Sequence, residues 1–203
     1  MKAVLFAITL YAGWTGAWLL ERSLEPRQPW LTTNAGSFAY WTAMKLLVWV
    51  APALALFRPP VFAVRRPALI WGGGAGLLAG LMALMGKIIG HQPLFHSTLS
   101  WALVNAVIVS PVVEEVAFRG ALLPYFLERH RFAVANSITA LLFVGAHLPG
   151  WYFQGRLKSM LLSPLGGALA IFILGLLFGW TAWRGKSVSA SILAHALNNL
   201  FNA

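Results

Sequence analysis

The sequence predicts an all-α membrane protein, a polytopic bundle of about seven transmembrane helices. Of its 203 residues, 59% are hydrophobic and only 10% are charged, whereas soluble domains carry about 25% charged residues. Apolar runs long enough to cross about 30 Å of hydrocarbon recur along the chain. A water-soluble globule is excluded, because so few charges cannot cover the surface of a chain that is 13% aromatic.

The apolar runs predict helices in chain order at residues 3–20, 37–57, 68–90, 99–127, 133–149, 161–183 and 187–203. Short polar or proline-containing segments connect them and leave no room for a soluble domain. The first run resembles a signal sequence, but Glu21 and Arg22 follow it in place of a small-residue cleavage site, so we interpret it as a retained anchor. We expect one membrane-embedded domain over residues 1–203, with its distinctive polar motifs at about 99–203.

Basic residues are more frequent in alternate gaps between the predicted helices. Eight lie on the side of the N-terminus: Lys2, Arg58, Arg65, Arg66, Arg129, Arg131, Arg184 and Lys186. Five lie on the other side: Arg22, Arg27, Lys87, Arg156 and Lys158. This bias predicts a cytoplasmic N-terminus and, with seven crossings, an external C-terminus. The scattered net charge of +10 favours anionic lipid over nucleic acid as a partner, and the expected location is a bacterial inner membrane.

A glycine-rich segment in the third predicted helix is interpreted as a packing surface. Gly72, Gly76 and Gly80 are spaced four residues apart and share one helical face. Such small residues let two helix backbones approach closely in lipid. The segment lacks the Gly-Lys-Ser/Thr ending of a phosphate-binding loop.

The acidic residues and the absence of cysteine restrict the possible chemistry. The chain has no Cys and no Asp, and its five acidic residues are all Glu. Disulfides, cysteine nucleophiles, aspartyl dyads and triads completed by Asp are therefore impossible.

The fourth predicted helix breaks the rule that charge lies at the ends of a span. Glu114, Glu115 and Arg119 lie well inside a long apolar run, with Glu114 and Glu115 near its middle, where each costs roughly 2.5–3.5 kcal/mol. Glu115 and Arg119 are four residues apart and can form an ion pair. Glu114 is turned about 100° away and is the carboxylate less neutralised by this arginine, as a general base requires. Pro111 should loosen the helix one turn earlier.

Two histidines also lie within apolar runs. His147 ends the sequence Phe143-Val144-Gly145-Ala146-His147, and His195 begins His195-Ala196-Leu197-Asn198-Asn199. His195 and Asn199 project from one face because they are four residues apart. A lone intramembrane histidine is most often an interhelical hydrogen bond. Here, however, three helices together carry several polar groups: carboxylates, an arginine, imidazoles and a carboxamide. Inside the bilayer these groups can form polar contacts only with one another.

Such a set supports amide hydrolysis. Glu114 and His147 can hold and deprotonate a water molecule, and His195 and Asn199 can donate hydrogen bonds to the oxyanion on the scissile carbonyl. Glu115 and Arg119 would then fix the base in place.

At these residues the sequence resembles the CPBP family of intramembrane proteases, which includes the endoproteases of prenylated CAAX proteins and bacteriocin-processing relatives. Three family motifs occur in order: Glu114-Glu115-x-x-x-Arg119, Phe143-x-x-x-His147 and His195-x-x-x-Asn199. The resemblance implies a metal-independent glutamate protease, without a cofactor, that cleaves a membrane-tethered protein or peptide. In it, Glu114 and His147 activate water while His195 and Asn199 form the oxyanion hole. Residues 1–100 show no family motif.

Other interpretations stay open at this point. Glu114 and the two histidines could bind a metal ion. The same polar core could belong to a small transporter or proton pathway, or to a membrane scaffold without catalysis. If the chain is a protease, the position of His147 beside Pro149 and Gly150 predicts that the site is reached from the extracytoplasmic side.

Overall fold

The structure, a computed structural model, is helical throughout its regular parts. It describes residues 1–58, 60–91, 93–94, 99–164 and 166–202, and no strand occurs among them. The helices are α1 (Lys2–Leu24), α2 (Asn34–Lys45), α3 (Ala51–Leu56), α4 (Arg66–Ile89), α5 (Trp101–Val104), α6 (Ser110–Glu115), α7 (Leu123–Leu127), α8 (Phe132–Phe153), α9 (Leu157–Leu162), α10 (Ala168–Gly185) and α11 (Val188–Asn202). The predicted all-α class is confirmed.

Six helices in the described part of the chain are long and apolar enough to cross a membrane. They cover Lys2–Leu24, Asn34–Leu56, Arg66–Ile89, Trp101–Leu127, Phe132–Phe153 and Ala168–Gly185. The seventh predicted span corresponds to α11, which has 15 residues and reaches only about 22 Å. Residue 203, the last residue of that predicted helix, lies outside the described residues. The protein is thus a polytopic helical bundle, with α11 shorter than a full span.

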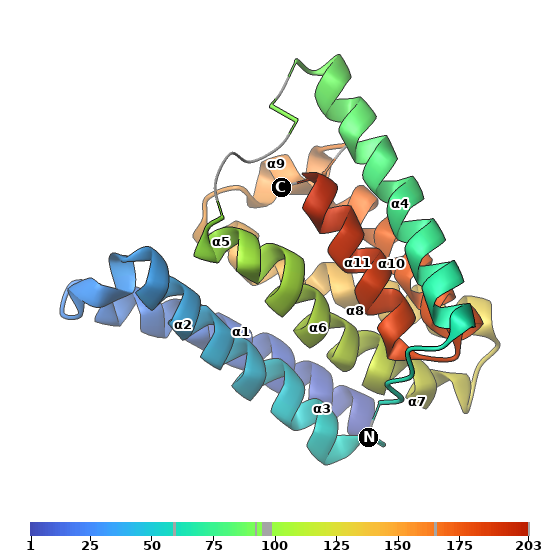
Figure 1. Ribbon diagram of the computed structural model, residues 1–203. Coiled ribbons are helices and arrows are strands. Elements are labelled where there is room, and N and C mark those ends of the chain that lie inside the picture. Colours follow the sequence, from blue (N-terminus) through green and yellow to red (C-terminus); the bar gives the residue numbers. More distant parts are fainter. Residues whose placement is uncertain (59, 92, 95–98, 165, 203) are drawn as a thin grey trace.

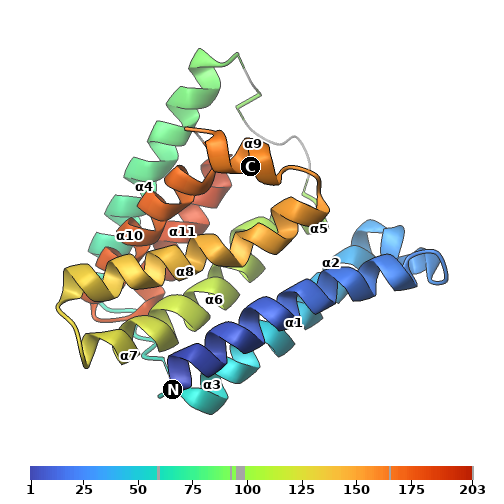
Figure 2. The same cartoon turned by 180° about the vertical axis from the view of Figure 1, so that it is seen from behind.

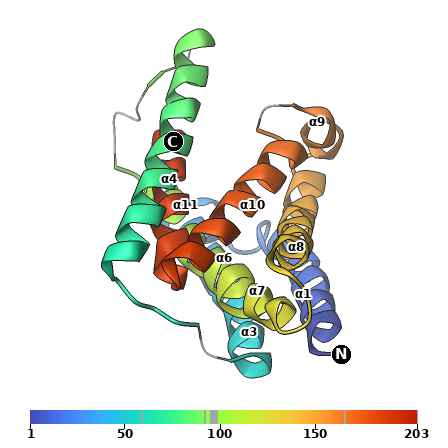
Figure 3. The same ribbon diagram turned by 90° about the vertical axis from the view of Figure 1, so that its right-hand side faces the viewer.

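The helices form three groups that face one another (Figure 1). The helix pair of α1 and α2–α3 lies on one side, and α4, α10 and α11 lie on the other. The long helix α5–α7 runs between them together with α8, as the view from behind also shows (Figure 2). Seen from the side, α4 and α11 are separated from α1 by the α6–α7 and α8 layer (Figure 3). Residues on the central helix can therefore contact both outer groups.

Three widened π-helical turns interrupt the long helices. They cover Leu46–Val50, Asn105–Val109 and Val116–Leu122, and each ends two residues before a proline: Pro52, Pro111 or Pro124. A proline has no N–H for the carbonyl four residues earlier, and a π turn re-pairs the backbone by bonding over five residues. The loosening predicted before Pro111 is confirmed, since Ser110 N bonds to Asn105 O.

The predicted helix 161–183 is wrong at its start. The structure instead has the short helix α9, Leu157–Leu162, followed by a break before α10 begins at Ala168. Pro164 and Gly166 lie in this break, and Gly166 has a φ of 77°. That left-handed backbone conformation suits glycine and does not continue a right-handed helix. Apolarity alone did not distinguish the two helices from one span.

The surface of the bundle is apolar and part of its interior is polar, as expected in lipid. Leu47, Leu78 and Leu141, on three different spans, each expose about three fifths of their surface (62%, 61% and 61%). Glu115 and Arg119, in contrast, are almost completely buried. This distribution of side chains agrees with an integral membrane protein.

The glycine face of α4 packs directly on α11. A Cβ atom built on Gly76 would lie 2.8 Å from Ala194 Cα, closer than real contacts allow. Gly72 meets the backbone of Ala190 and Gly80 meets the ring of Phe201. The predicted packing role of these glycines is confirmed, and it fixes the helix that carries His195.

We expect Gly76→Ala to destabilise the protein by about 1–3 kcal/mol, because the added methyl group must push α11 away. Thermal unfolding in detergent micelles measures the change. Gly74→Ala is a matched control, since nothing lies within 4 Å of a Cβ atom there, and it should be neutral or slightly stabilising. Equal stability of the two variants would contradict the packing role.

Candidate active site

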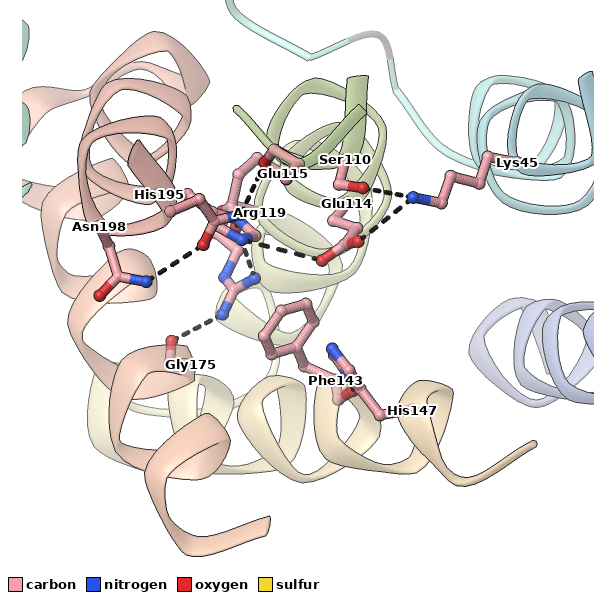
Figure 4. A network of polar contacts seen from close by, with 12 residues as sticks. Lys45, Ser110, Glu114, Glu115, Arg119, Phe143, His147, Gly175, His195 and Asn198 are labelled. Carbon is pink, nitrogen blue, oxygen red and sulfur yellow. Dashed lines mark hydrogen bonds and ion pairs between the residues drawn. The ribbon is translucent and has the colours of Figure 1, made fainter. Parts of the chain in front are cut away.

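The ionisable residues of the central helix are buried where the three helix groups meet. Glu114 and Glu115 end α6, and Arg119 lies in the π turn that follows. All three are at most 8% exposed, and Glu115 is 0% exposed. Figure 4 shows the side chains of Lys45 from α2 and His195 from α11 beside them, with the Gly175 carbonyl of α10 next to Arg119.

Glu115 joins the central helix to α11. Its Oε1 atom accepts hydrogen bonds from Arg119 Nη1 at 3.0 Å and from His195 Nδ1 at 2.9 Å. Arg119 Nη2 also donates to the Gly175 carbonyl of α10 at 2.8 Å. The predicted Glu115–Arg119 ion pair is confirmed, and it connects three helices without contact with solvent.

Glu114 faces a different set of groups. Its Oε1 lies 3.9 Å from Lys45 Nζ, and its Oε2 lies 4.0 Å from His195 Nε2. Both distances exceed a hydrogen bond. Glu114 therefore has charged and polar neighbours but keeps oxygen lone pairs that neither neighbour occupies.

His147 approaches Glu114 from α8. Its Nδ1 lies 2.8 Å from the carbonyl of Phe143, one helical turn earlier, so Nε2 is the ring nitrogen left for another partner. The imidazole packs edge-on against Phe143, with ring centroids 4.9 Å apart. The Phe143 ring also faces the Arg119 guanidinium, and its centroid lies 4.6 Å from Arg119 Cζ. The Phe143-x-x-x-His147 motif thus fixes the imidazole through its own aromatic residue.

A polar hollow of about 240 Å³ brings Glu114 and His147 together. At roughly 30 Å³ per water molecule, it has room for water and part of a peptide. Gln154 and Arg156 line the hollow beyond the end of α8. Its complete lining is Trp14, Lys45, Trp49, Glu114, Ala146, His147, Gly150, Trp151, Gln154 and Arg156.

Asn199 bonds to Ala106 and Asn198 in this structure. Its Nδ2 donates to the Ala106 carbonyl at 2.8 Å, and its Oδ1 accepts from Asn198 Nδ2 at 3.1 Å. The structure thus brings together Glu114, Glu115, Arg119 and His195, and places His147 in the same hollow as Glu114. Asn199 is on the predicted helix, and each end of its carboxamide has one protein partner.

The sequence argument missed Lys45. This residue ends α2, is 7% exposed and donates to Ser110 Oγ, with Asn105 Oδ1 3.5 Å away. Its signal was a lysine within the apolar run 37–57, but a single lysine carries no motif. The sequence placed Glu114 on a face turned away from Arg119, but in the structure Lys45 is a nearby cation for this carboxylate.

The part of the chain that the structure describes contains no group of three or more His, Cys, Asp or Glu side chains placed to hold a metal ion. The alternative metal ligands, Glu114, His147 and His195, are therefore not arranged as one such set. Metal independence remains a prediction.

The fold and the buried cluster define a polytopic integral membrane protein with an ionisable site inside its helical bundle. A family model described as type II CAAX prenyl endopeptidase Rce1-like matches residues 95–201. Because this match covers more than half of the chain, the protein belongs to that family, which confirms the resemblance drawn from the three motifs. Comparisons with curated proteins and with solved structures gave no match. Membership implies a protease that acts on a membrane-associated protein.

Proposed function

We propose that the protein is an intramembrane endopeptidase that hydrolyses a peptide bond with a water molecule activated by Glu114 and His147. The observation that carries this proposal is that a buried carboxylate and an imidazole line one hollow, although they come from different helices. A general base must be within reach of the proton that it removes. The hollow supplies the space for that water and for the scissile peptide.

The proposed reaction begins when Glu114 takes a proton from water held by His147. The water oxygen bonds to the carbonyl carbon, and the carbonyl oxygen becomes an oxyanion. Glu114 then gives the proton to the amide nitrogen as the C–N bond breaks, which leaves a carboxyl and an amine product. General acid and base catalysis of this kind contributes about 10²- to 10⁴-fold to a rate.

His195 and Asn199 are proposed to stabilise the oxyanion. His195 Nδ1 donates to Glu115, so Nε2, which faces Glu114, is the ring atom left for the substrate, and it donates to the oxyanion when both ring nitrogens carry a hydrogen. Asn199 Nδ2 bonds to the Ala106 carbonyl through one N–H, and its second N–H is the donor proposed for the oxyanion. Glu115 and Arg119 act on the reaction only by holding His195 and the central helix in place.

We further propose that substrate arrives from the extracytoplasmic side of a bacterial inner membrane. Lys2, Arg58 and Arg129 line one pocket at the N-terminal end of the bundle, which the bias of basic residues places in the cytoplasm next to anionic lipid. Arg22 donates to the Phe153 carbonyl at the opposite end, near the Gln154 side of the hollow. A membrane-tethered or exported substrate fits this access.

Cysteine labelling tests the orientation, and the chain has no cysteine of its own. We expect a membrane-impermeant maleimide applied to intact spheroplasts to label Lys158→Cys but not His130→Cys, because these exposed residues lie at opposite ends of α8. Labelling of Lys158→Cys only after the membrane is broken would contradict extracytoplasmic access.

The endopeptidase proposal is tested with purified protein in liposomes and membrane-anchored reporter peptides analysed by mass spectrometry. Peptide cleavage that persists in a strong chelator is the expected result. Loss of cleavage in chelator with recovery in zinc would support the metal alternative instead. Proton or solute flux across the liposomes without cleavage of any peptide would favour the transporter interpretation.

A further inference from the structure

Lys45 is a buried cation for which the proposed reaction has no role so far. It lies within a span, is 7% exposed and lies outside residues 95–201, which match the family model. A lysine inside a membrane span costs about 2.5–3.5 kcal/mol on insertion scales. Such a residue is retained only where buried partners or a function compensate for this cost.

Among the described residues, the buried lysine and arginine side chains match the two buried glutamates one to one. Apart from His195 and Tyr40, the ionisable side chains in the buried class are Lys45, Glu114, Glu115 and Arg119. Arg119 pairs with Glu115 at 3.0 Å. The cation within 4 Å of Glu114 is Lys45, at 3.9 Å. Without it, the site would hold two adjacent carboxylates and one cation.

The geometry stabilises the charge of Glu114 without occupying its oxygen atoms. Lys45 Nζ donates to Ser110 Oγ, and Asn105 Oδ1 lies 3.5 Å away. Ser110 and Glu114 are four residues apart, so the anchor of the ammonium and the carboxylate share one helical face. The 3.9 Å separation is too long for a hydrogen bond, yet close enough for strong attraction in a buried site.

We infer that Lys45 is a positioning residue for Glu114, which keeps the carboxylate directed into the hollow. Figure 4 shows the lysine reaching from α2 to Ser110 and Glu114 on the central helix. This inference rests on the proposed function of Glu114 as general base. It assigns to α2 a part in a site whose motifs all lie on later helices.

The test is the pH dependence of kcat/KM for peptide cleavage in liposomes by Lys45→Met and Lys45→Arg. A cation within about 4–6 Å favours the ionised form of a carboxylate. Lys45→Met should therefore move the acidic limb of the profile to higher pH, and Lys45→Arg should restore it. The other titratable or charged groups near Glu114 are His195 on α11, His147 on α8, Glu115 and Arg119 on its own helix, and Arg156 in the lining of the same hollow; the variants keep all five.

Two further variants keep the test decisive. Ser110→Ala removes the anchor of the ammonium group but keeps Lys45 and Glu114. It should therefore move the acidic limb in the same direction by a smaller amount. This variant decides the matter if Lys45→Met does not fold. Lys158→Met, in exposed α9, should leave the profile unchanged. The role of Lys45 is overturned, and the proposed function is not, if Glu114→Gln is inactive and the acidic limb stays in place in Lys45→Met. If Lys45→Met does not fold, an unmoved limb in Ser110→Ala has the same meaning. Activity retained by Glu114→Gln would overturn the proposed function itself.

Discussion

Glu114→Gln and His147→Ala should each slow peptide cleavage by about 10²- to 10⁴-fold, and the double variant should be no slower than the slower single variant. The amide of glutamine cannot accept the proton of water, and alanine cannot hold that water. Both residues act on one water molecule in one hollow, so the loss of either removes the same step. Residues that act as a unit are strongly non-additive in this way.

Single-turnover rates on the anchored reporter peptide measure this coupling. Glu128→Gln is the matched control, because this glutamate is exposed beyond the end of α7 and should leave the rate within about twofold. Unfolding temperatures should show that all variants fold. A double variant slowed by the product of the two single effects would mean that the residues act independently. Full activity of Glu114→Gln would refute the general-base proposal.

The class of protein and much of the site could be predicted from the sequence, because lipid makes buried polar residues rare and therefore informative. The four-residue spacing of Glu115 and Arg119 predicted an ion pair that the structure contains. The spacing of Gly72 and Gly76 likewise predicted the close packing seen between α4 and α11. Both arguments depend only on helical periodicity, which holds wherever the chain is helical.

Contacts between distant segments could not be predicted in the same way. Nothing in the spacing of Lys45 indicates that it reaches Ser110, 65 residues later. The four-residue spacing of His195 and Asn199 gave their shared face, but not the Ala106 carbonyl that binds the Asn199 amide. These partners depend on how α2 and α11 pack against the central helix, and the periodicity of one helix does not contain that information.

Arg119→Met should destabilise the protein by about 3–5 kcal/mol, the usual cost of removing one partner from a buried ion pair. The variant would leave Glu115 with no exposure to solvent and without its arginine. It would also remove the hydrogen bond that Arg119 Nη2 donates to the Gly175 carbonyl on α10. Because the guanidinium joins α10 to the central helix, we expect lower cooperativity of unfolding as well as a lower midpoint in denaturant.

Arg129→Met supplies the comparison, because Arg129 forms an ion pair with Glu128 at 3.2 Å while about half of each side chain is exposed (51% and 47%). Exposed pairs contribute about 0–1 kcal/mol, so this variant should unfold almost as the parent does. Adding Glu115→Gln to Arg119→Met should recover part of the stability, since no unpaired charge then stays buried. If Arg119→Met were as stable as Arg129→Met, the Glu115–Arg119 pair would not hold the central helix, and its role in placing His195 would fail with it.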